Sequence, residues 1–198
     1  MTWFFLTAGE AAHRGCCETP ASTVAVQRWD SACAALAHLG VPAERLHQLG
    51  LFDGMIPGKG TRGFAEAVGQ LAAFFSRIEP EEIYLPHPQE GWPDHVAASD
   101  LGLAASARYE TPHGLIFYPV WLWHTLRFRR LFRLRGWRPV RLDIATVRAE
   151  KVAAIRQYLT AENPSCGVPY CGRLPKGFLW PFQRKQEIFF QFKGEHRR

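Results

Sequence analysis

The stretch of sequence that decides the fold is PHPQEGWPDHVAASD, residues 86–100. A short β-like run, EIYL at residues 82–85, precedes it, and a helix-like run that includes Val96, Leu101 and Leu103 follows it. A strand that leads through a polar loop into a helix is typical of an α/β fold, in which ligands bind beyond the carboxyl ends of the strands. We therefore expect this loop to lie at the functional edge of a parallel sheet.

The same loop contains the densest group of metal-capable side chains in the chain, His87, Glu90, Asp94 and His95. Asp94 can cap the helix that His95 opens. A neutral imidazole beside carboxylates suits zinc or another divalent ion, and a zinc site needs three or four ligands, for which His87, Glu90 and His95 are the local candidates. A histidine beside an aspartate is also commonly a hydrogen-bonded surface pair, so a metal site and a well-capped loop both remain open.

Strands and helices alternate along the chain before this loop. In order, we expect a strand at residues 3–6, a helix that Thr19 caps and Gly40 ends, a strand at 45–51, a helix at about 62–77 that Thr61 caps, and a strand at 83–85. Such alternation predicts an α/β fold with right-handed crossovers. The predicted architecture is a three-layer sandwich around a Rossmann-like, mostly parallel sheet.

The alternation is less regular beyond residue 107. There we expect strands at residues 115–123, 140–144 and 187–192, and a helix at 146–159 whose inward side carries Val147, Val152, Ile155 and Leu159. A chain of 198 residues is long enough to bury a full core. We therefore predict a single domain over residues 1–198, with a regular α/β part at 1–107 and a less regular part at 108–198.

Composition and charge narrow the class of protein. The chain is 47% apolar, which fits a packed globular protein, and its net charge of +6 allows an anionic partner without requiring one. Its five cysteines form neither an even framework nor a pair of zinc hooks, which favours a reducing, cytoplasmic compartment. No apolar run reaches the roughly 20 residues of a membrane span.

Two further polar residues follow the first two predicted strands. Arg28, on the first helix, could clamp a phosphate or sugar hydroxyls, or it could be a solvated helix arginine. Asp53 precedes a glycine, as a turn residue does, and it could equally accept a hydrogen bond from a ligand hydroxyl. The sequence contains no G-x-S-x-G elbow, no P-loop and no G-x-G-x-x-G, which disfavours serine-nucleophile chemistry and nucleotide binding by those devices.

The segment from Arg127 to Arg141, RFRRLFRLRGWRPVR, carries much of the positive charge. Phe128, Phe132 and Trp137 are interleaved with its arginines, and a helix here would have a ragged apolar side. Such a segment could lie on an anionic membrane surface or contact nucleic acid. A solvated arginine face on a packed element explains it equally well, and we expect no nucleic-acid partner.

Several motifs, taken in order, resemble those of the PIG-L/LmbE-like family of zinc-dependent N-deacetylases, which remove acetyl groups from N-acetylglucosamine-type substrates. In the first half of the chain they are Thr7-Ala8-Gly9-Glu10 for T-D-G-E, Arg28 ahead of Gly40 for R-x-x-E…A…L-G, residues 49–54 for the strand-plus-aspartate segment, and Trp92-Pro93-Asp94-His95 for H-P-D-H. In the second half they are Tyr118 and Trp121 for Y-x-x-W, and Lys151, Ala154, Ile155 and Tyr158 for K-x-x-A-I-x-x-Y. The resemblance covers nearly the whole chain.

This resemblance implies a role for each candidate residue. His95 would be a zinc ligand with Asp94 in support, and Arg28, Asp53 and Trp92 would contact the substrate, an N-acetylated amino sugar or glycoconjugate. Zinc in such a site polarises the amide and activates a water molecule. Peripheral membrane contact is a less favoured expectation for this chain.

The sequence departs from the family pattern at the most important motif. The family's A-H-P-D-D-E segment, which ends its first strand and supplies two zinc ligands and the general base, does not occur in these residues. We therefore expect that the first strand of the family fold is absent, that Met1 is a mis-set or truncated start, and that the base is encoded upstream of Met1. The chain as given is then expected to be inactive and its zinc site incomplete, although His87-Pro88-Gln89-Glu90 loosely echoes the absent motif.

Smaller departures affect individual positions. Ala8 and Ser31 replace an aspartate and a glutamate of the family motifs, and Trp92 stands where the family has a histidine thought to assist the developing oxyanion. An indole offers one donor and no charge. The alternative function is therefore a non-catalytic family member that binds carbohydrate, or an anionic surface through the segment from Arg127 to Arg141.

Overall fold

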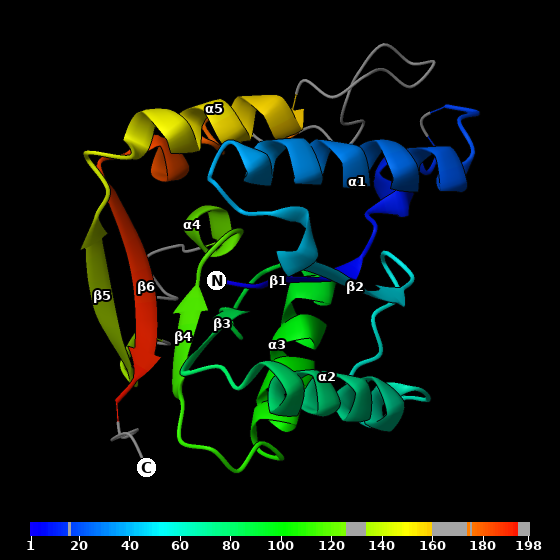
Figure 1. Cartoon of the computed structure of the whole chain (residues 1–198), viewed down its shortest axis with the longest axis vertical. Helices are drawn as coiled ribbons and strands as arrows, with labels where there is room; N and C mark the ends of the chain where they lie inside the picture. Colours follow the sequence, from blue (N-terminus) through cyan, green and yellow to red (C-terminus); the bar gives the residue numbers. More distant parts are fainter. Residues whose placement is uncertain (16, 126–133, 160–173, 175, 194–198) are drawn as a thin grey trace. The chain divides into compact units, whose positions relative to one another are not determined.

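The computed structural model describes residues 1–15, 17–125, 134–159, 174 and 176–193 (Figure 1). Its helices and strands form two compact units, and each is described by itself. Unit 1 contains Met1–Met55 and Ile144–Lys185, and unit 2 contains Ile56–Asp143 and Gln186–Arg198. Strands and helices alternate through both units, which confirms the predicted α/β class.

Unit 1 is built on two parallel strands and the helices associated with them. β1 (Trp3–Thr7) pairs with β2 (Leu46–Leu51), and the elements between them are η1 (Glu10–His13), α1 (Ala21–Ala37) and η2 (Ala43–Arg45). The later part of the chain adds α5 (Arg148–Leu159) and η4 (Trp180–Gln183). α5 lies alongside α1 in Figure 1, and the two helices are in contact.

The ends of α1 follow from local sequence. Gly40, with φ 71°, places its N–H on the carbonyl of Ala37, while the N–H of Val41 bonds to the carbonyl of Leu36. This is a Schellman arrangement, in which a left-handed glycine ends the helix, as the sequence predicted. The predicted N-cap is wrong by one residue, because Pro20 rather than Thr19 precedes the helix and no side chain caps it.

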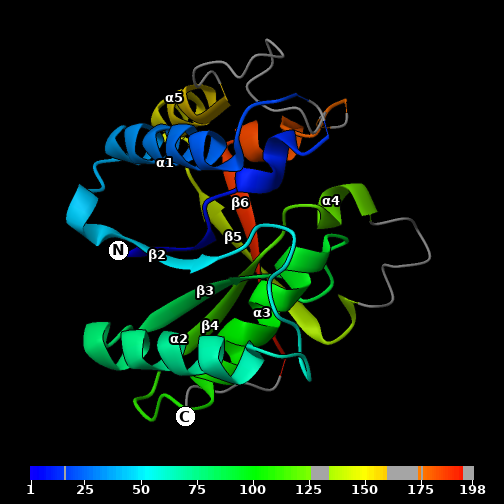
Figure 2. The same cartoon turned by 90° about the vertical axis from the view of Figure 1, so that its right-hand side faces the viewer.

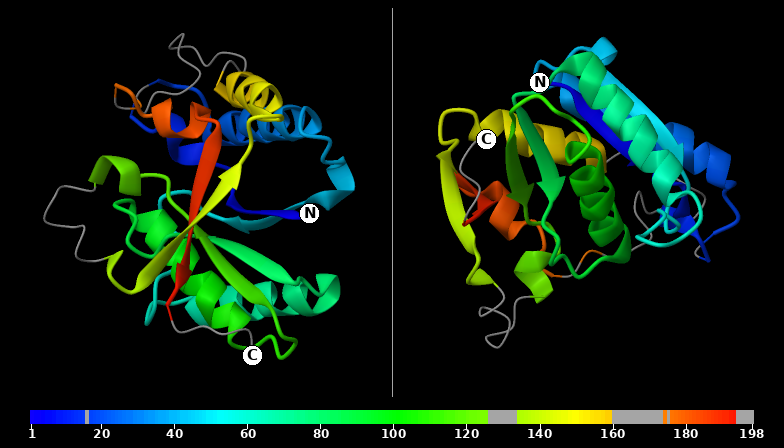
Figure 3. Two further views of the ribbon diagram at one scale, coloured as in Figure 1. Left: turned by 90° about the vertical axis from the view of Figure 1, so that its left-hand side faces the viewer. Right: turned by 90° about the horizontal axis from the view of Figure 1, so that it is seen from below.

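Unit 2 contains a mixed sheet of order β3-β4-β6-β5. Its strands are β3 (Glu82–Pro86), β4 (Gly114–Tyr118), β5 (Trp137–Asp143) and β6 (Gln186–Phe192), and its helices are α2 (Phe64–Ile78), α3 (Pro93–Ser106) and the short α4 (Leu122–Thr125). β3 and β4 are parallel, whereas β6 runs antiparallel to both β4 and β5 (Figure 3). Among the strands that the structure describes, the parallel pairs are β1 with β2 and β3 with β4.

Helix α3 connects β3 to β4 and packs against β3 and α2 (Figure 2). The approach to β3 is close at Gly102, where an added Cβ would lie 2.2 Å from Cδ2 of Leu85. Leu101 and Ala105 are fully buried on the same helix. The close packing of α3 on β3 fixes the start of the helix at the end of the strand, where the predicted functional loop lies.

Three boundaries differ from the sequence predictions. Gly63 rather than Thr61 precedes α2, because the Thr61 hydroxyl donates to the carbonyl of Gly58 instead. The predicted strand at 115–123 ends at Tyr118, since Pro119 has no N–H for a strand ladder, and α4 begins at Leu122. The predicted inward side of α5 is also wrong in part, because Val147 precedes the helix and is exposed and Ala154 is its buried residue.

The strands belong to two separate sheets. Among the described residues, β1 pairs only with β2, and β3, at one edge of the four-stranded sheet, pairs only with β4. The expectation that the first strand of the family fold is absent from these residues stays a prediction.

Candidate active site

The loop between β3 and α3 carries the candidate residues of unit 2. Trp92 is the N-cap residue of α3, in extended conformation, and Pro93 occupies the first turn, where its lack of an N–H costs nothing. The prediction that Asp94 caps this helix is wrong, because Trp92 occupies that position and no side chain makes a capping hydrogen bond. The Asp94 charge instead lies in the first turn of the helix, near the positive end of the helix dipole.

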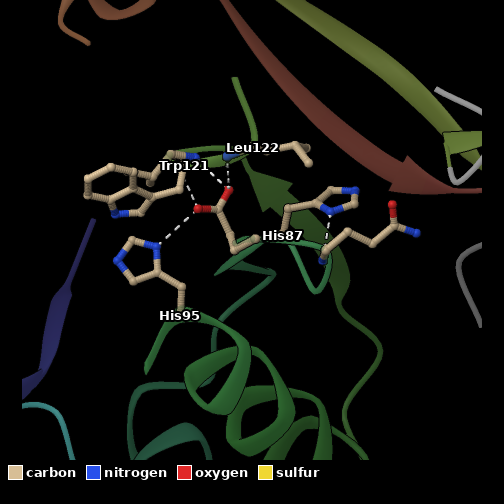
Figure 4. A network of polar contacts seen from close by, with 7 residues as sticks. His87, His95, Trp121 and Leu122 are labelled. Carbon is tan, nitrogen blue, oxygen red and sulfur yellow. Dashed lines mark hydrogen bonds and ion pairs between the residues drawn. The ribbon is translucent and has the colours of Figure 1, made fainter. Parts of the chain in front are cut away.

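Glu90 has hydrogen-bond partners inside and outside this loop, and its bonds to His95, Trp121 and Leu122 are among the dashed lines of Figure 4. Its side chain is fully buried, and its Oε1 accepts hydrogen bonds from the N–H groups of Val120 at 2.7 Å and Leu122 at 3.2 Å. Its Oε2 accepts from the N–H of Trp121 at 2.5 Å and lies 3.2 Å from Nδ1 of His95. One carboxylate therefore joins the loop after β3, the turn after β4 and the first turn of α3.

The hydrogen bonds keep Glu90 ionised. Burial by itself would raise the pKa of the carboxyl group, but the bonds from His95 and from the three backbone N–H groups outweigh burial and lower it below its ordinary value. The Glu90 charge also acts on Tyr118, whose pKa rises to about 12 through burial and, secondarily, through this charge. The candidate site thus contains a buried carboxylate that is ionised at neutral pH.

His87 is a core residue and not a candidate ligand. Its side chain is fully buried, its ring centroid lies 4.3 Å from that of Trp137 and 5.1 Å from that of Phe190, and its Nδ1 accepts the N–H of Gln89 at 3.1 Å. Burial lowers its pKa to about 4, although the Glu90 charge opposes this shift. The described side chains of His87, Glu90 and His95 are not grouped so that they could hold a metal ion, so the predicted ligand set is wrong, and so is the echo of the absent motif in residues 87–90.

His95 differs from His87 in its exposure. About 30% of its side chain is exposed, and its ring is oriented by Glu90 with the second nitrogen facing away from the carboxylate (Figure 4). Within the described part of the chain, no group of three or more His, Cys, Asp or Glu side chains could hold a metal ion. The donor chemistry of His95 fits zinc, but it provides a single ligand and not a complete site.

Trp92 and Trp121 form an aromatic pair beside this network. Their rings are stacked with centroids 5.2 Å apart and an interplanar angle of 15°, and Trp92 is 46% exposed. The backbone of Trp121 is held by Glu90, so the pair is attached to the same buried carboxylate as His95. Trp92 thus presents a fixed indole surface immediately before the helix that carries His95.

Unit 1 holds the other two candidates, Arg28 and Asp53. Asp53 and Glu10 link the loops after β1 and β2, because the N–H of Asp53 donates to Oε1 of Glu10 at 2.8 Å and the N–H of Ala11 donates to Oδ2 of Asp53 at 3.1 Å. The loops at the carboxyl ends of these two parallel strands are therefore in contact. Asp53 has the structural role expected of a turn aspartate, and a substrate role for it stays a prediction.

Arg28 is a packed residue of α1 and not a solvated one. Its Nη2 donates to the hydroxyl of Tyr158 at 2.6 Å, and its guanidinium carbon lies 5.3 Å from the centroid of the Tyr158 ring. The side chain also lies under Gly9, where an added Cβ would be 2.2 Å from Nε of Arg28. The glycine of the T-x-G-E turn therefore makes room for the guanidinium. Whether Arg28 also contacts substrate stays a prediction.

The arginine-rich segment is described only in part. Residues 126–133 lie outside the described residues, and residues 137–141 belong to β5, so the carboxyl-terminal end of the segment is a strand and not a helix. Arg138 and Arg141 are exposed on that strand. No helix among the described residues has the length and apolar character that crossing a bilayer requires.

The sequence matches the family model described as PIG-L, GlcNAc-PI de-N-acetylase, over residues 1–106. This match covers more than half of the chain, which therefore belongs to the PIG-L family. No curated protein sequence matches the chain.

Solved structures show the same fold at low sequence identity. The conserved protein TT1542 from Thermus thermophilus has a TM-score of 0.62 and 23% identity, over 95% of this chain and 79% of its own. An N,N'-diacetylchitobiose deacetylase from Pyrococcus horikoshii has a TM-score of 0.58 and 15% identity, over 82% of this chain and 59% of its own. These similarities confirm the predicted three-layer α/β fold.

One protein of similar structure is named as an enzyme other than a deacetylase. GalB from Pseudomonas putida KT2440, a 4-carboxy-2-hydroxymuconate hydratase, has a TM-score of 0.60 and 16% identity, over 100% of this chain and 98% of its own. The fold therefore supports more than one chemistry, and the reaction has to be argued from the family and from the site.

Proposed function

We propose that this chain carries part of the active site of a zinc-dependent deacetylase, which hydrolyses the N-acetyl group of an N-acetylglucosamine-type sugar or glycoconjugate. The observation that carries the proposal is the arrangement of His95. This histidine lies at the start of α3, beyond the carboxyl end of the parallel strand β3, and its Nδ1 is hydrogen-bonded to the buried carboxylate of Glu90. The chain that carries it belongs to the PIG-L family. Histidines that bind zinc are commonly held in this way.

In the proposed site, His95 is a zinc ligand and Asp94 lies beside it in the first turn of α3. When bound, zinc would polarise the acetamide carbonyl and lower the pKa of a bound water. The remaining ligands and the general base are proposed to come from the A-H-P-D-D-E segment that these residues lack. The described residues alone do not form a zinc site, so the chain by itself is proposed to be inactive.

The chain's own residues would contact the sugar. Arg28 and Asp53 are proposed to bind substrate hydroxyls, because the first is a guanidinium held on the Tyr158 ring and the second lies in the turn at the end of β2. Trp92 is proposed to contact the sugar through its exposed indole face, which Trp121 supports from behind. Because an indole cannot provide the charge of a histidine, oxyanion stabilisation at this position is expected to be weak.

Acetate release tests the proposal directly. We expect acetate release from N-acetylglucosamine derivatives only when the chain is extended through its upstream reading frame and zinc is present, and we expect its loss in His95→Ala. An upstream frame without an H-P-D-D motif, or full activity in His95→Ala, would overturn the proposal. The proposed location is cytoplasmic, and Cys33 forms no disulfide among the described residues.

The second candidate function is non-catalytic binding of carbohydrate or of an anionic surface. It is favoured by Trp92 in place of the family histidine and by the exposed Arg138 and Arg141 on β5. It predicts binding to anionic lipid vesicles that weakens steeply with salt, without bound zinc. Zinc-dependent acetate release, together with vesicle binding that does not change with salt concentration, would exclude this second function.

A further inference from the structure

We infer that Glu90 is a positioning residue, which fixes His95 as the tautomer with its proton on Nδ1 and leaves Nε2 as a hydrogen-free acceptor. The inference rests on the proposed function only for what that acceptor binds, a divalent metal ion. Its basis is the geometry of the buried carboxylate, and none of the family motifs quoted above includes Glu90.

The hydrogen-bond count decides the tautomer. An ionised carboxylate only accepts hydrogen bonds, so the 3.2 Å contact between Oε2 of Glu90 and Nδ1 of His95 requires a proton on Nδ1. A neutral imidazole carries a single ring proton, so Nε2 then has a lone pair. Figure 4 shows this second nitrogen on the side of the ring away from Glu90.

Glu90 cannot easily turn away from His95. Its two oxygens are held by the N–H groups of three consecutive residues, Val120 to Leu122, and the side chain has no exposed surface. Each of these N–H groups would be left without its carboxylate acceptor if the side chain rotated. The turn between β4 and α4 thus fixes the carboxylate, and the carboxylate fixes the imidazole.

Substitution by glutamine separates this role from simple support of the turn. Every group around the carboxylate is a donor, so the amide nitrogen of Glu90→Gln must face one of them. At the Oε1 position it would oppose both Val120 and Leu122, whereas at the Oε2 position it would oppose Trp121 and His95. The Oε2 position is favoured, because His95 can respond by moving its proton to Nε2 and accepting at Nδ1.

The experiment is histidine NMR on the metal-free chain, with ¹⁵N-labelled imidazoles and a pH of about 8, above the ordinary range of histidine titration. We expect the proton of His95 on Nδ1 in the wild type and on Nε2 in Glu90→Gln. The control is Glu110→Gln, which removes the same charge at an exposed site and should leave the His95 signals unchanged. A wild-type His95 with its proton on Nε2 would overturn the inference, and this result needs no variant to fold.

Zinc titration of the chain extended upstream provides a second readout. Loss of the carboxylate behind a metal-binding histidine weakens affinity by about 10- to 100-fold. We expect this loss in Glu90→Gln and wild-type affinity in Glu110→Gln. If Glu90→Gln keeps both the Nδ1 proton and the zinc affinity, Glu90 only supports the turn and the inference fails. If the wild type has the expected tautomer but binds no zinc, the proposed function fails while the role of Glu90 stands.

Discussion

The loops beyond the strands of the two units are held by carboxylates in different ways. In unit 2, Glu90 is fully buried and accepts three backbone N–H groups and one imidazole. In unit 1, Asp53 and Glu10 are partly buried, and the carboxylate of each accepts a backbone N–H from the facing loop. The difference is that one fully buried carboxylate holds the loop around His95, whereas two partly buried carboxylates join the turns after β1 and β2.

The largest expected effect is that of Glu90→Ala. It leaves three backbone N–H groups without their carboxylate acceptor, each at a cost of about 1–3 kcal/mol, so we expect the free energy of unfolding to fall by about 4 kcal/mol. Urea unfolding measures this loss. If Asp53→Ala lowered the free energy of unfolding as much as Glu90→Ala does, the proposed contrast between the two units would be wrong.

The buried His87 should make the stability of unit 2 depend on pH. Its pKa is about 4 in the folded protein and 6.5 ordinarily, so the unfolded state binds a proton at a higher pH than the folded state does. The contribution of the neutral His87 to the free energy of unfolding is therefore complete above pH 6.5 and is lost as the pH falls from 6.5 to 4. A difference of this size corresponds to about 3 kcal/mol. Urea unfolding across this range should show the slope in the wild type and a shallower one in His87→Phe. Identical slopes in the two proteins would contradict the burial of His87.

In unit 1, Gly9→Ala tests the packing of Arg28. The substitution combines a positive φ of 71° with a contact of 2.2 Å to Nε of Arg28, and we expect a loss of about 2–3 kcal/mol in the free energy of unfolding. Gly54→Ala is the matched control, because Gly54 has a φ of 78° and no atom within 4 Å of the added Cβ. The control should lose only about 1 kcal/mol, and equal losses would show that Arg28 moves aside freely.

The smallest expected effect on stability is that of Asp53→Asn. The amide oxygen can still accept the N–H of Ala11, so we expect a loss below about 1 kcal/mol. If Asp53 also binds the sugar, the same variant should raise KM for N-acetylglucosamine derivatives in the extended chain by about tenfold. An unchanged KM would leave Asp53 with its structural role alone.

Much of the amino-terminal half could be predicted from sequence, because its signals are local. The apolar runs of β1 and β3, the glycine that ends α1 and the alternation of strands with helices each depend on neighbouring residues. The boundary at Tyr118 could not be predicted in this way. It depends on Pro119 and on a carboxylate that lies 30 to 32 residues earlier and binds the next three N–H groups.

The candidate site could be predicted only in part, for the same reason. The motif around Trp92 and His95 indicated a helix here, although the helix begins at Pro93 and Asp94 does not cap it. The sequence gives no sign that His87 is buried among aromatic rings from β4, β5 and β6. The spacing of His87, Glu90 and His95 in the sequence suggested that Glu90 is a metal ligand. Its hydrogen-bond partners are the backbone N–H groups of residues 120–122, and motif spacing cannot reveal them. The antiparallel insertion of β6 between β4 and β5 is likewise a long-range pairing without a local signal.

The central claim is that His95 is a metal ligand whose remaining partners lie outside these residues, and zinc content tests it most directly. Inductively coupled plasma mass spectrometry of the chain extended through its upstream reading frame should find about one zinc per chain in the wild type. The exposed His38 provides the control, and His38→Ala should keep this zinc whereas His95→Ala should lose it. Stoichiometric zinc in His95→Ala, or none in the wild type, would contradict the account.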